Sequence, residues 1–443
     1  MGRNVEEIDA DGDDERLERV AAIDVAKASG KVCVRLPGNK RRVTKVWDVS
    51  STTNAVMALA DELAELRVER VVVESTSDYW RPFFYLLEAR GLRVWLVNAR
   101  DVKQVPGRPK TDKLDAVWLA KLNERGMLRA SFVPPRDIRE LRDYTRLRVE
   151  LVRERSRHKQ RVEKLLEDAL IKLSTVATDI FGKSGRAMLE ALIAGERDPR
   201  ALAELALGKM RPKRPALVEA LNGRFDDHHA FLARMLLDNI DTLTAKIDQL
   251  TARAEELIAT LPSAGPPGPV SGDPDTDYTG GLSVLERLDE VPGIGRLAAQ
   301  VIVAEVGLNM AQFPTPAHLV SWTKLSPRTI QSGPRTRGGK VGKGNPYLKG
   351  ILGEVAASAA KTDTFLGERY RRLVRRTGKQ KALVAVARSI LVIIWHLLAD
   401  PTARYIDLGP DHYDQRINKD RKTRNLIRQL QALGHQVTLN PAA

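Results

Sequence analysis

The chain has 443 residues, of which 43% are hydrophobic and 29% charged, a composition typical of a globular protein with about three domains. Its 72 Lys and Arg residues outnumber 57 Asp and Glu residues, and the net charge of +15 favours a polyanionic partner, most commonly nucleic acid. The single cysteine, Cys33, excludes a disulfide framework and a cysteine-rich zinc module.

Residues 1–19 form an acidic head that we expect to be disordered, and they lack the apolar core of a signal peptide. Strands and helices then alternate over residues 20–135. Strands are predicted at 20–26, 31–36, 44–49, 70–74 and 93–97, and helices at 53–66, 79–89 and 111–125. Three strands followed by alternating helices and strands are the order expected of a ribonuclease-H-like α/β domain.

Beyond residue 135 the strand pattern disappears, and residues 136–261 are predicted to be helical. A long basic helix at 136–173 carries candidate nucleic-acid contacts at Arg146, Arg153 and Arg157. A heptad seam runs from Ile240 to Leu257, and it fits either a hairpin within the chain or a contact between subunits.

A flexible linker rich in Pro, Gly and Ser is predicted at 262–281, followed by a mainly helical third domain at 282–401 and a charged tail at 402–443 with one helix near 422–433. The most apolar run, residues 382–398, is short and interrupted by Arg388, so we expect a buried helix and a cytoplasmic protein without a membrane span.

Four carboxylates could form a metal centre. Asp24 interrupts an apolar strand, Glu74 ends a second strand expected beside it, and Asp112 and Asp115 share one face of a helix. Converging carboxylates repel each other unless divalent ions neutralise them, and oxygen-only ligands suit Mg²⁺. Taken singly, Asp112 and Asp115 also fit a solvated helix start, and Glu74 fits a strand-end charge facing water.

Two further signals point to phosphate binding. The turn Val291-Pro-Gly-Ile-Gly, with Gly293, Gly295 and Arg296, fits either a helix–hairpin–helix contact with DNA or an ordinary packing corner. Residues 306–353 contain no Asp or Glu and centre on a Gly-rich loop that favours phosphate contact over a plain surface loop. Its candidate contacts are Lys324, Arg328, Arg335, Arg337, Lys340 and Lys343.

Ser332 lies in this loop, but a serine before glycine is ordinarily turn chemistry, and no histidine spacing indicates a triad. His228 and His229 show no metal-ligand pattern, and we expect them to be solvated on a charged helix face.

The chain resembles the DEDD insertion-sequence transposases, relatives of the Piv invertase known as bridge-RNA-guided recombinases. The resemblance covers residues 21–133 and 285–398. It is carried by Ile23-Asp-Val-Ala-Lys, Val73-Glu-Ser, Lys110-Thr-Asp-x-x-Asp-Ala, Val291-Pro-Gly-Ile-Gly, Ser332-Gly and Lys340-x-x-Lys-Gly-Asn. After Glu74 the sequence departs from its relatives, and Asp78 is a rival carboxylate.

The resemblance implies a RuvC-like domain in which Asp24, Glu74, Asp112 and Asp115 bind Mg²⁺, and a serine nucleophile that falls on Ser332, with Ser321 and Ser326 as alternatives. It also implies donor and target DNA as substrates, a structured bridge RNA as guide, and a homo-oligomer, either a dimer or a tetramer. A hydrolytic Holliday-junction resolvase and a non-catalytic nucleic-acid scaffold are the competing functions.

Overall fold

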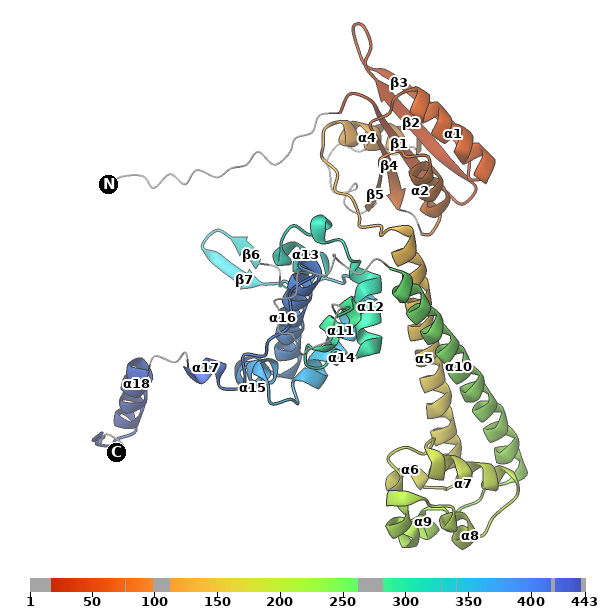
Figure 1. The fold of residues 1–443 in the computed structure, drawn as a ribbon, viewed down its shortest axis with the longest axis vertical. Helices are drawn as coiled ribbons and strands as arrows, with labels where there is room; N and C mark the ends of the chain where they lie inside the picture. The colour runs from red at the N-terminus through yellow and green to blue at the C-terminus, as the bar shows by residue number, and fades with distance from the viewer. Residues whose placement is uncertain are drawn as a thin grey trace, which may run out of the picture. The chain divides into compact units, whose positions relative to one another are not determined.

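A computed structural model describes residues 17–75, 77–98, 112–261, 282–327, 329–339, 341–415 and 419–439. The predicted acidic head up to residue 16 and the predicted linker at 262–281 lie outside these residues. The chain divides into two compact units, Met1–Val133 and Pro134–Ala443 (Figure 1).

The first unit is a five-stranded mixed sheet with helices on both faces. Its elements in chain order are β1 (Val20–Val25), β2 (Ser29–Leu36), β3 (Val43–Ser50), α1 (Thr53–Glu65), β4 (Arg70–Ser75), α2 (Trp80–Ala89), β5 (Val94–Asn98) and α4 (Asp112–Glu124). The strand order is β3-β2-β1-β4-β5. The pairs β1–β2 and β2–β3 are antiparallel, whereas β1–β4 and β4–β5 are parallel.

Side chains that alternate along β1 fill two separate cores. Ala21 and Ile23 pack with α1 and α2, while Ala22 packs with α4 on the opposite face of the sheet. Both faces of the sheet are therefore covered, which explains why its strands are nearly continuous apolar runs. The predicted strands and helices of this unit are all present.

The second unit is mostly helical. Its elements are α5 (Arg136–Asp168), α6 (Leu173–Val176), α7 (Lys183–Ile193), α8 (Pro199–Glu204), the 3₁₀ helix η1 (Gly208–Lys213), α9 (Arg214–Ala220), α10 (Asp227–Thr260), α11 (Val284–Asp289), α12 (Arg296–Val306), the 3₁₀ helix η2 (Met310–Gln312), α13 (Pro316–Trp322), β6 (Thr329–Ser332), β7 (Arg335–Gly338), α14 (Pro346–Ala359), α15 (Phe365–Thr377), α16 (Lys379–Ala399), α17 (His412–Gln415) and α18 (Lys419–Ala432).

The helices α5 and α10 pack along each other (Figure 1). Ile240, Leu243 and Ile247 of the heptad seam are buried, so this seam makes the intramolecular contact that was one of its two predicted uses. The long basic helix ends at Asp168, earlier than predicted, and Leu170 just beyond it has a positive φ of 60° that no helix continues through.

Two strands contradict the prediction that no strand follows residue 135. The strands β6 and β7 form an antiparallel hairpin in which Ser332 pairs with Arg335. The loop of two residues between them begins at Gly333, whose φ of 56° suits such a turn.

The apolar run expected as a buried helix is α16, which packs against α13, α14 and α15. By length and composition α16 could cross a membrane, but Val386, Ile390 and Ile394 are fully buried within the unit. Its apolar character is that of a core helix.

Candidate functional site

Asp24 and Glu74 lie on adjacent parallel strands and on the same face of the sheet. The β1–β4 register aligns Ile23 with Val73, so the next residue of each strand is one of the two carboxylates. Val97, the register partner of Glu74 on β5, belongs to the core on the α4 side. Glu74 is only 6% exposed and Asp24 is half-buried. Two carboxylates therefore meet on the α4-covered face at the carboxyl ends of β1 and β4.

The helix α4 runs antiparallel to these strands and brings Asp115 to the same level. Near the C-terminal end of α4, buried Asn123 donates hydrogen bonds to the carbonyl oxygens of Ala21 (3.1 Å) and Arg70 (3.2 Å), at the start of β1 and β4. From Asn123 back to Asp115 the helix rises about 12 Å. From Arg70 to Glu74 the strand rises about 13 Å, so the Asp115 backbone is level with Glu74.

Asp115 also faces the sheet. Leu119, one helical turn further along α4, is 1% exposed in the core between α4 and the sheet, and residues four apart share a helix face. Asp112 begins α4 one turn before Asp115; its side chain lies outside the described residues. The structure thus places Asp24 and Glu74 at neighbouring positions on one face of the sheet, and α4, which carries Asp115, covers that face.

The donor set of this site fits a hard divalent cation. Three carboxylates, one of them buried, supply only oxygen atoms, and such clusters are stable when a cation neutralises them. Asp78, the rival carboxylate, has a side chain that is 73% exposed and lies 3.2 Å from Arg81 in an ion pair at the start of α2. The helix α2, which Asp78 precedes, packs on the face of the sheet opposite α4.

Lys31 is a neighbour of the site that the sequence did not single out. It is the register partner of Asp24 on β2, and its Nζ lies 2.5 Å from Asp48 Oδ1 on β3. Asp24, Lys31 and Asp48 thus form a row across three strands on one face. The turn between β1 and β2 lies at Lys27-Ala28, and the register that it sets makes Asp24 and Lys31 neighbours.

The basic loop of the second unit divides into a hairpin and a docked segment. Arg335 and Arg337 on β7 are exposed. Ser332 ends β6, and its side chain lies outside the described residues, as do Arg328 and Lys340. Of the alternative serines, Ser321 is exposed in α13 and Ser326 is half-buried in the turn that follows.

The segment after the hairpin packs closely on the end of α13, next to Lys324 and Lys343. A side chain on Gly344 would lie 2.3 Å from the carbonyl oxygen of Thr323, so only glycine permits this approach. Lys349 Nζ donates to the carbonyl oxygen of Gly342 (2.8 Å). Lys324 and Lys343 remain exposed beside this fixed backbone.

The Pro-Gly-Ile-Gly turn has two glycines with different surroundings. Gly293 has a φ of 90°, and a Cβ there would lie 2.5 Å from the carbonyl oxygen of Val355 on α14. This close approach fits the interpretation of the turn as a packing corner. Gly295 is the N-cap of α12, and a Cβ there would meet no atom within 4 Å. Arg296 pairs with Glu255 of α10 at 3.0 Å. The open N-terminus of α12 at Gly295 keeps the phosphate-binding interpretation available.

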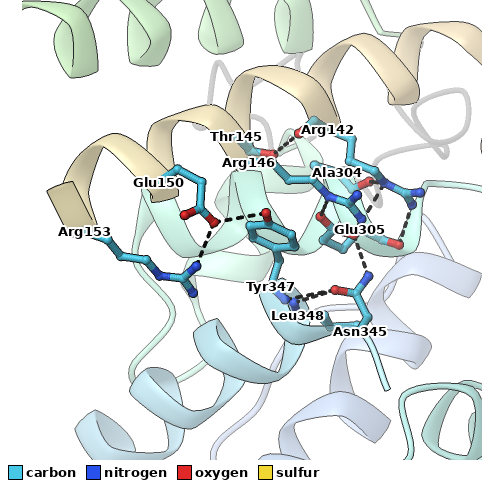
Figure 2. A network of polar contacts seen from close by, with 10 residues as sticks. All are labelled: Arg142, Thr145, Arg146, Glu150, Arg153, Ala304, Glu305, Asn345, Tyr347 and Leu348. Atoms are coloured by element: carbon cyan, nitrogen blue, oxygen red, sulfur yellow. Dashed lines mark hydrogen bonds and ion pairs between the residues drawn. The ribbon is translucent and has the colours of Figure 1, made fainter. Parts of the chain in front are cut away.

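Arg146, predicted to contact nucleic acid, instead pairs with a fully buried carboxylate. Its Nε and Nη2 donate to the two oxygens of Glu305 at 2.7 and 2.8 Å (Figure 2). Asn345 also donates to Glu305 (2.6 Å), and Arg142 lies 3.4 Å away. Burial lowers the pKa of Arg146, but the hydrogen bonds and charge of Glu305 outweigh this effect and raise it. Arg146 is therefore paired within the chain, with a carboxylate that also lies close to Arg142.

The other two arginines of α5 that were predicted to contact nucleic acid are held less firmly by partners within the chain. Arg153 pairs with Glu150 at 2.7 Å, and both side chains are about half exposed. Arg157 is exposed and forms no ion pair with any of the described residues.

Asp168, His228 and His229 place three potential metal-ligating atoms within 4.8 Å of one another. The expectation that both histidines are solvated is wrong for His229, which is 4% exposed. The Nδ1 of His229 accepts the backbone N–H of Asp226 (3.1 Å), so its proton lies on Nε2, which donates to Asp168 (3.2 Å). His229 has no lone pair left for a metal, and the cluster is a helix cap for α10.

The fold thus presents carboxylates at the carboxyl ends of β1 and β4 and exposed arginines on the β6–β7 hairpin. Family models identify the relatives of the chain. A DEDD transposase model of IS110 elements matches residues 21–171, and a model described as the IS116/IS110/IS902 transposase family matches residues 285–371.

The two models together match more than half of the chain, and we conclude that it belongs to the IS110 family of DEDD insertion-sequence transposases. An uncharacterised 43.6 kDa protein of insertion element IS110 from Streptomyces coelicolor is 32% identical over 117 residues. That alignment covers 26% of this chain and 29% of the relative.

Proposed function

We propose that this protein is the transposase of a mobile element, which cuts and rejoins DNA strands in the cytoplasm. The observation that carries the proposal is that Asp24 and Glu74 occupy neighbouring positions on the sheet face that α4, with Asp115, covers. Membership of the DEDD family implies a divalent cation, and we assign Mg²⁺ to these carboxylates together with Asp112. The strand order β3-β2-β1-β4-β5 supports a RuvC-like, ribonuclease-H-like domain.

The carboxylates would hold Mg²⁺, which when bound stabilises the negative charge that develops on a phosphate during strand transfer. The side chains themselves orient this centre: buried Glu74 is fixed by the sheet, and Asp115 is fixed by the anchoring of α4 through Asn123. The exposed arginines of the β6–β7 hairpin would hold the DNA strand by its phosphates.

We assign the nucleophile to Ser332, which ends β6 within this hairpin. Its hydroxyl oxygen would form an ester with a DNA phosphate and displace the sugar oxygen, which leaves with the serine proton. Reversal with another strand end reseals the backbone, and the ester conserves the energy of the phosphodiester bond. We further propose a structured bridge RNA as guide and a homo-oligomer as the active form.

The test is a recombination assay with donor DNA, target DNA and the cognate RNA. Asp24→Asn and Ser332→Ala should each abolish recombination. Asp61→Asn is the matched control, because Asp61 is exposed on α1, on the face opposite the site, and pairs only weakly with Arg90 at 3.4 Å.

If Asp24→Asn recombines DNA as the wild type does, the assignment of the metal centre is overturned. If Ser332→Ala does so, the assignment of the nucleophile is overturned. A protein–DNA adduct trapped with the wild-type chain and lost in Ser332→Ala would separate strand transfer from hydrolysis. A hydrolytic resolvase forms no such adduct.

A further inference from the structure

The helix α15 carries a group of arginines outside the site described above. We call Arg369, Arg372, Arg375 and Arg376 the α15 arginine face. Together with Leu373 and Tyr413 of α17 they line a pocket of about 380 Å³. The family model for this part of the chain ends at residue 371, so three of these arginines lie beyond it.

Tyr413 holds two of these guanidinium groups in place. Its ring stacks on Phe365 at a centroid distance of 5.2 Å and an interplanar angle of 17°. Its hydroxyl oxygen accepts a hydrogen bond from Arg369 Nη1 (2.9 Å), and the Arg372 guanidinium lies 4.2 Å from the ring centroid. The short helix α17 therefore fixes these two arginine side chains, which lowers the conformational entropy that they would lose on binding a ligand.

No ion pair with a described residue matches the charge of this face. Glu368 and Asp363 both pair with Arg371, at 2.8 and 3.3 Å. Within the part of the chain that the structure describes, Arg372, Arg375 and Arg376 form no ion pair, and all three are exposed. Like charges gathered over two helical turns repel each other, and a bound anion relieves that repulsion.

The spacing of the arginines suits a polymer of phosphates. Arg369, Arg372 and Arg376 follow one another at three and four residues, so they share one face and span about 10 Å along the axis. A nucleic-acid strand carries one phosphate about every 3.4 Å of helix axis, and guanidinium groups bind phosphates through paired N–H donors.

We propose that the α15 arginine face binds the phosphodiester backbone of a nucleic acid, as a contact separate from the β6–β7 hairpin. The ring of Tyr413 is occupied by Phe365 and Arg372, so it orients arginines rather than stacking on a base. The contact is consequently independent of sequence.

The test compares the Arg372→Gln/Arg376→Gln double variant with an Arg200→Gln/Arg224→Gln control in the full-length protein. All four arginines are exposed, and the two double substitutions lower the net charge equally. Arg200 lies in α8, and Arg224 lies before α10. Affinity for a random-sequence DNA duplex and for an RNA hairpin is measured by fluorescence anisotropy over a range of salt concentrations. Thermal unfolding checks that both variants fold.

The α15 variant should lose about tenfold in affinity, and its slope of log K against log salt should flatten by about 1 to 2, whereas the control keeps the wild-type slope. A loss with DNA alone, RNA alone or both supports the proposal and identifies which nucleic acid supplies the phosphates. Equal slopes for the two variants, with both nucleic acids, would overturn it.

Discussion

Replacing Glu305 with glutamine should destabilise the unit Pro134–Ala443 more than any exposed charge change on α5. Glu305 is fully buried, and its carboxylate accepts hydrogen bonds from Arg146 and Asn345 (Figure 2). Removing one member of a buried ion pair costs about 3–5 kcal/mol, because the partner charge stays buried.

The contacts of this site place the cost near the lower end of that range. Arg142 keeps hydrogen bonds to the carbonyl oxygens of Ala304 (3.0 Å) and Glu305 (2.9 Å), and the Arg146 side chain is 34% exposed and can regain water. Glutamine adds a clash, however. Asn345 Oδ1 caps α14 by accepting the N–H groups of Tyr347 and Leu348, so its amide cannot turn to accept from glutamine.

We therefore expect a loss of about 3 kcal/mol, which corresponds to a fall of about 5 °C in Tm for a unit of this size. Differential scanning calorimetry of the full-length chain gives the Tm. The matched control is Glu150→Gln, whose side chain is 49% exposed and pairs with Arg153; an exposed pair contributes less than about 1 kcal/mol.

Adding Arg146→Met to Glu305→Gln should cost little more than Glu305→Gln alone, since it removes the charge left unmatched. If Glu305→Gln lowers the Tm no more than Glu150→Gln does, burial of this carboxylate is not what stabilises the contact between α5 and α12.

Further predictions concern one buried cysteine and two glycines. Burial raises the pKa of the Cys33 thiol to about 11 from 9.0, so at pH 8 its thiolate fraction is about 100-fold lower than in the unfolded chain. Native protein should therefore react slowly with a thiol reagent and unfolded protein quickly. Equal reaction rates would contradict this prediction. Gly293→Ala should lower stability by about 1–3 kcal/mol, because its Cβ would lie 2.5 Å from the Val355 carbonyl oxygen at a φ of 90°. Gly295→Ala, in open space, should cost less than about 1 kcal/mol and weaken DNA binding if phosphate approaches α12 there; thermal melts and anisotropy distinguish the two glycines.

The sheet and its carboxylates were predictable because their signals are local. Asp24 stands out as an acid within the apolar run Ala-Ala-Ile-Asp-Val, and parallel strands bring their carboxyl ends to one edge whatever the details of packing. The strands β6 and β7 were not predictable in the same way. Thr-Ile-Gln-Ser and Arg-Thr-Arg-Gly carry almost no apolar alternation, because the hairpin has little core to pack against.

The pairing of Arg146 with Glu305 lies beyond the reach of sequence patterns for another reason. The two residues are 159 positions apart, and α12 is so apolar that a single acid in it gives no sign of its partner. Glu305 does mark the last acid before the acid-free stretch 306–353. Its hydrogen bond from Asn345, inside that stretch, ties the start of α14 to this carboxylate.

The internal pairing changes where a polyanion would bind. Arg146 is neutralised by Glu305 and Arg296 by Glu255, so the surplus of basic residues counted along α5 and α12 overstates the charge offered to a ligand. Arg335 and Arg337 of the hairpin and Arg372, Arg375 and Arg376 of α15 are exposed, and none of them has an ion pair within the described residues. Because unmatched charge gains more from a phosphate than charge already paired, we infer that the net charge of +15 acts on nucleic acid mainly through the β6–β7 hairpin and α15.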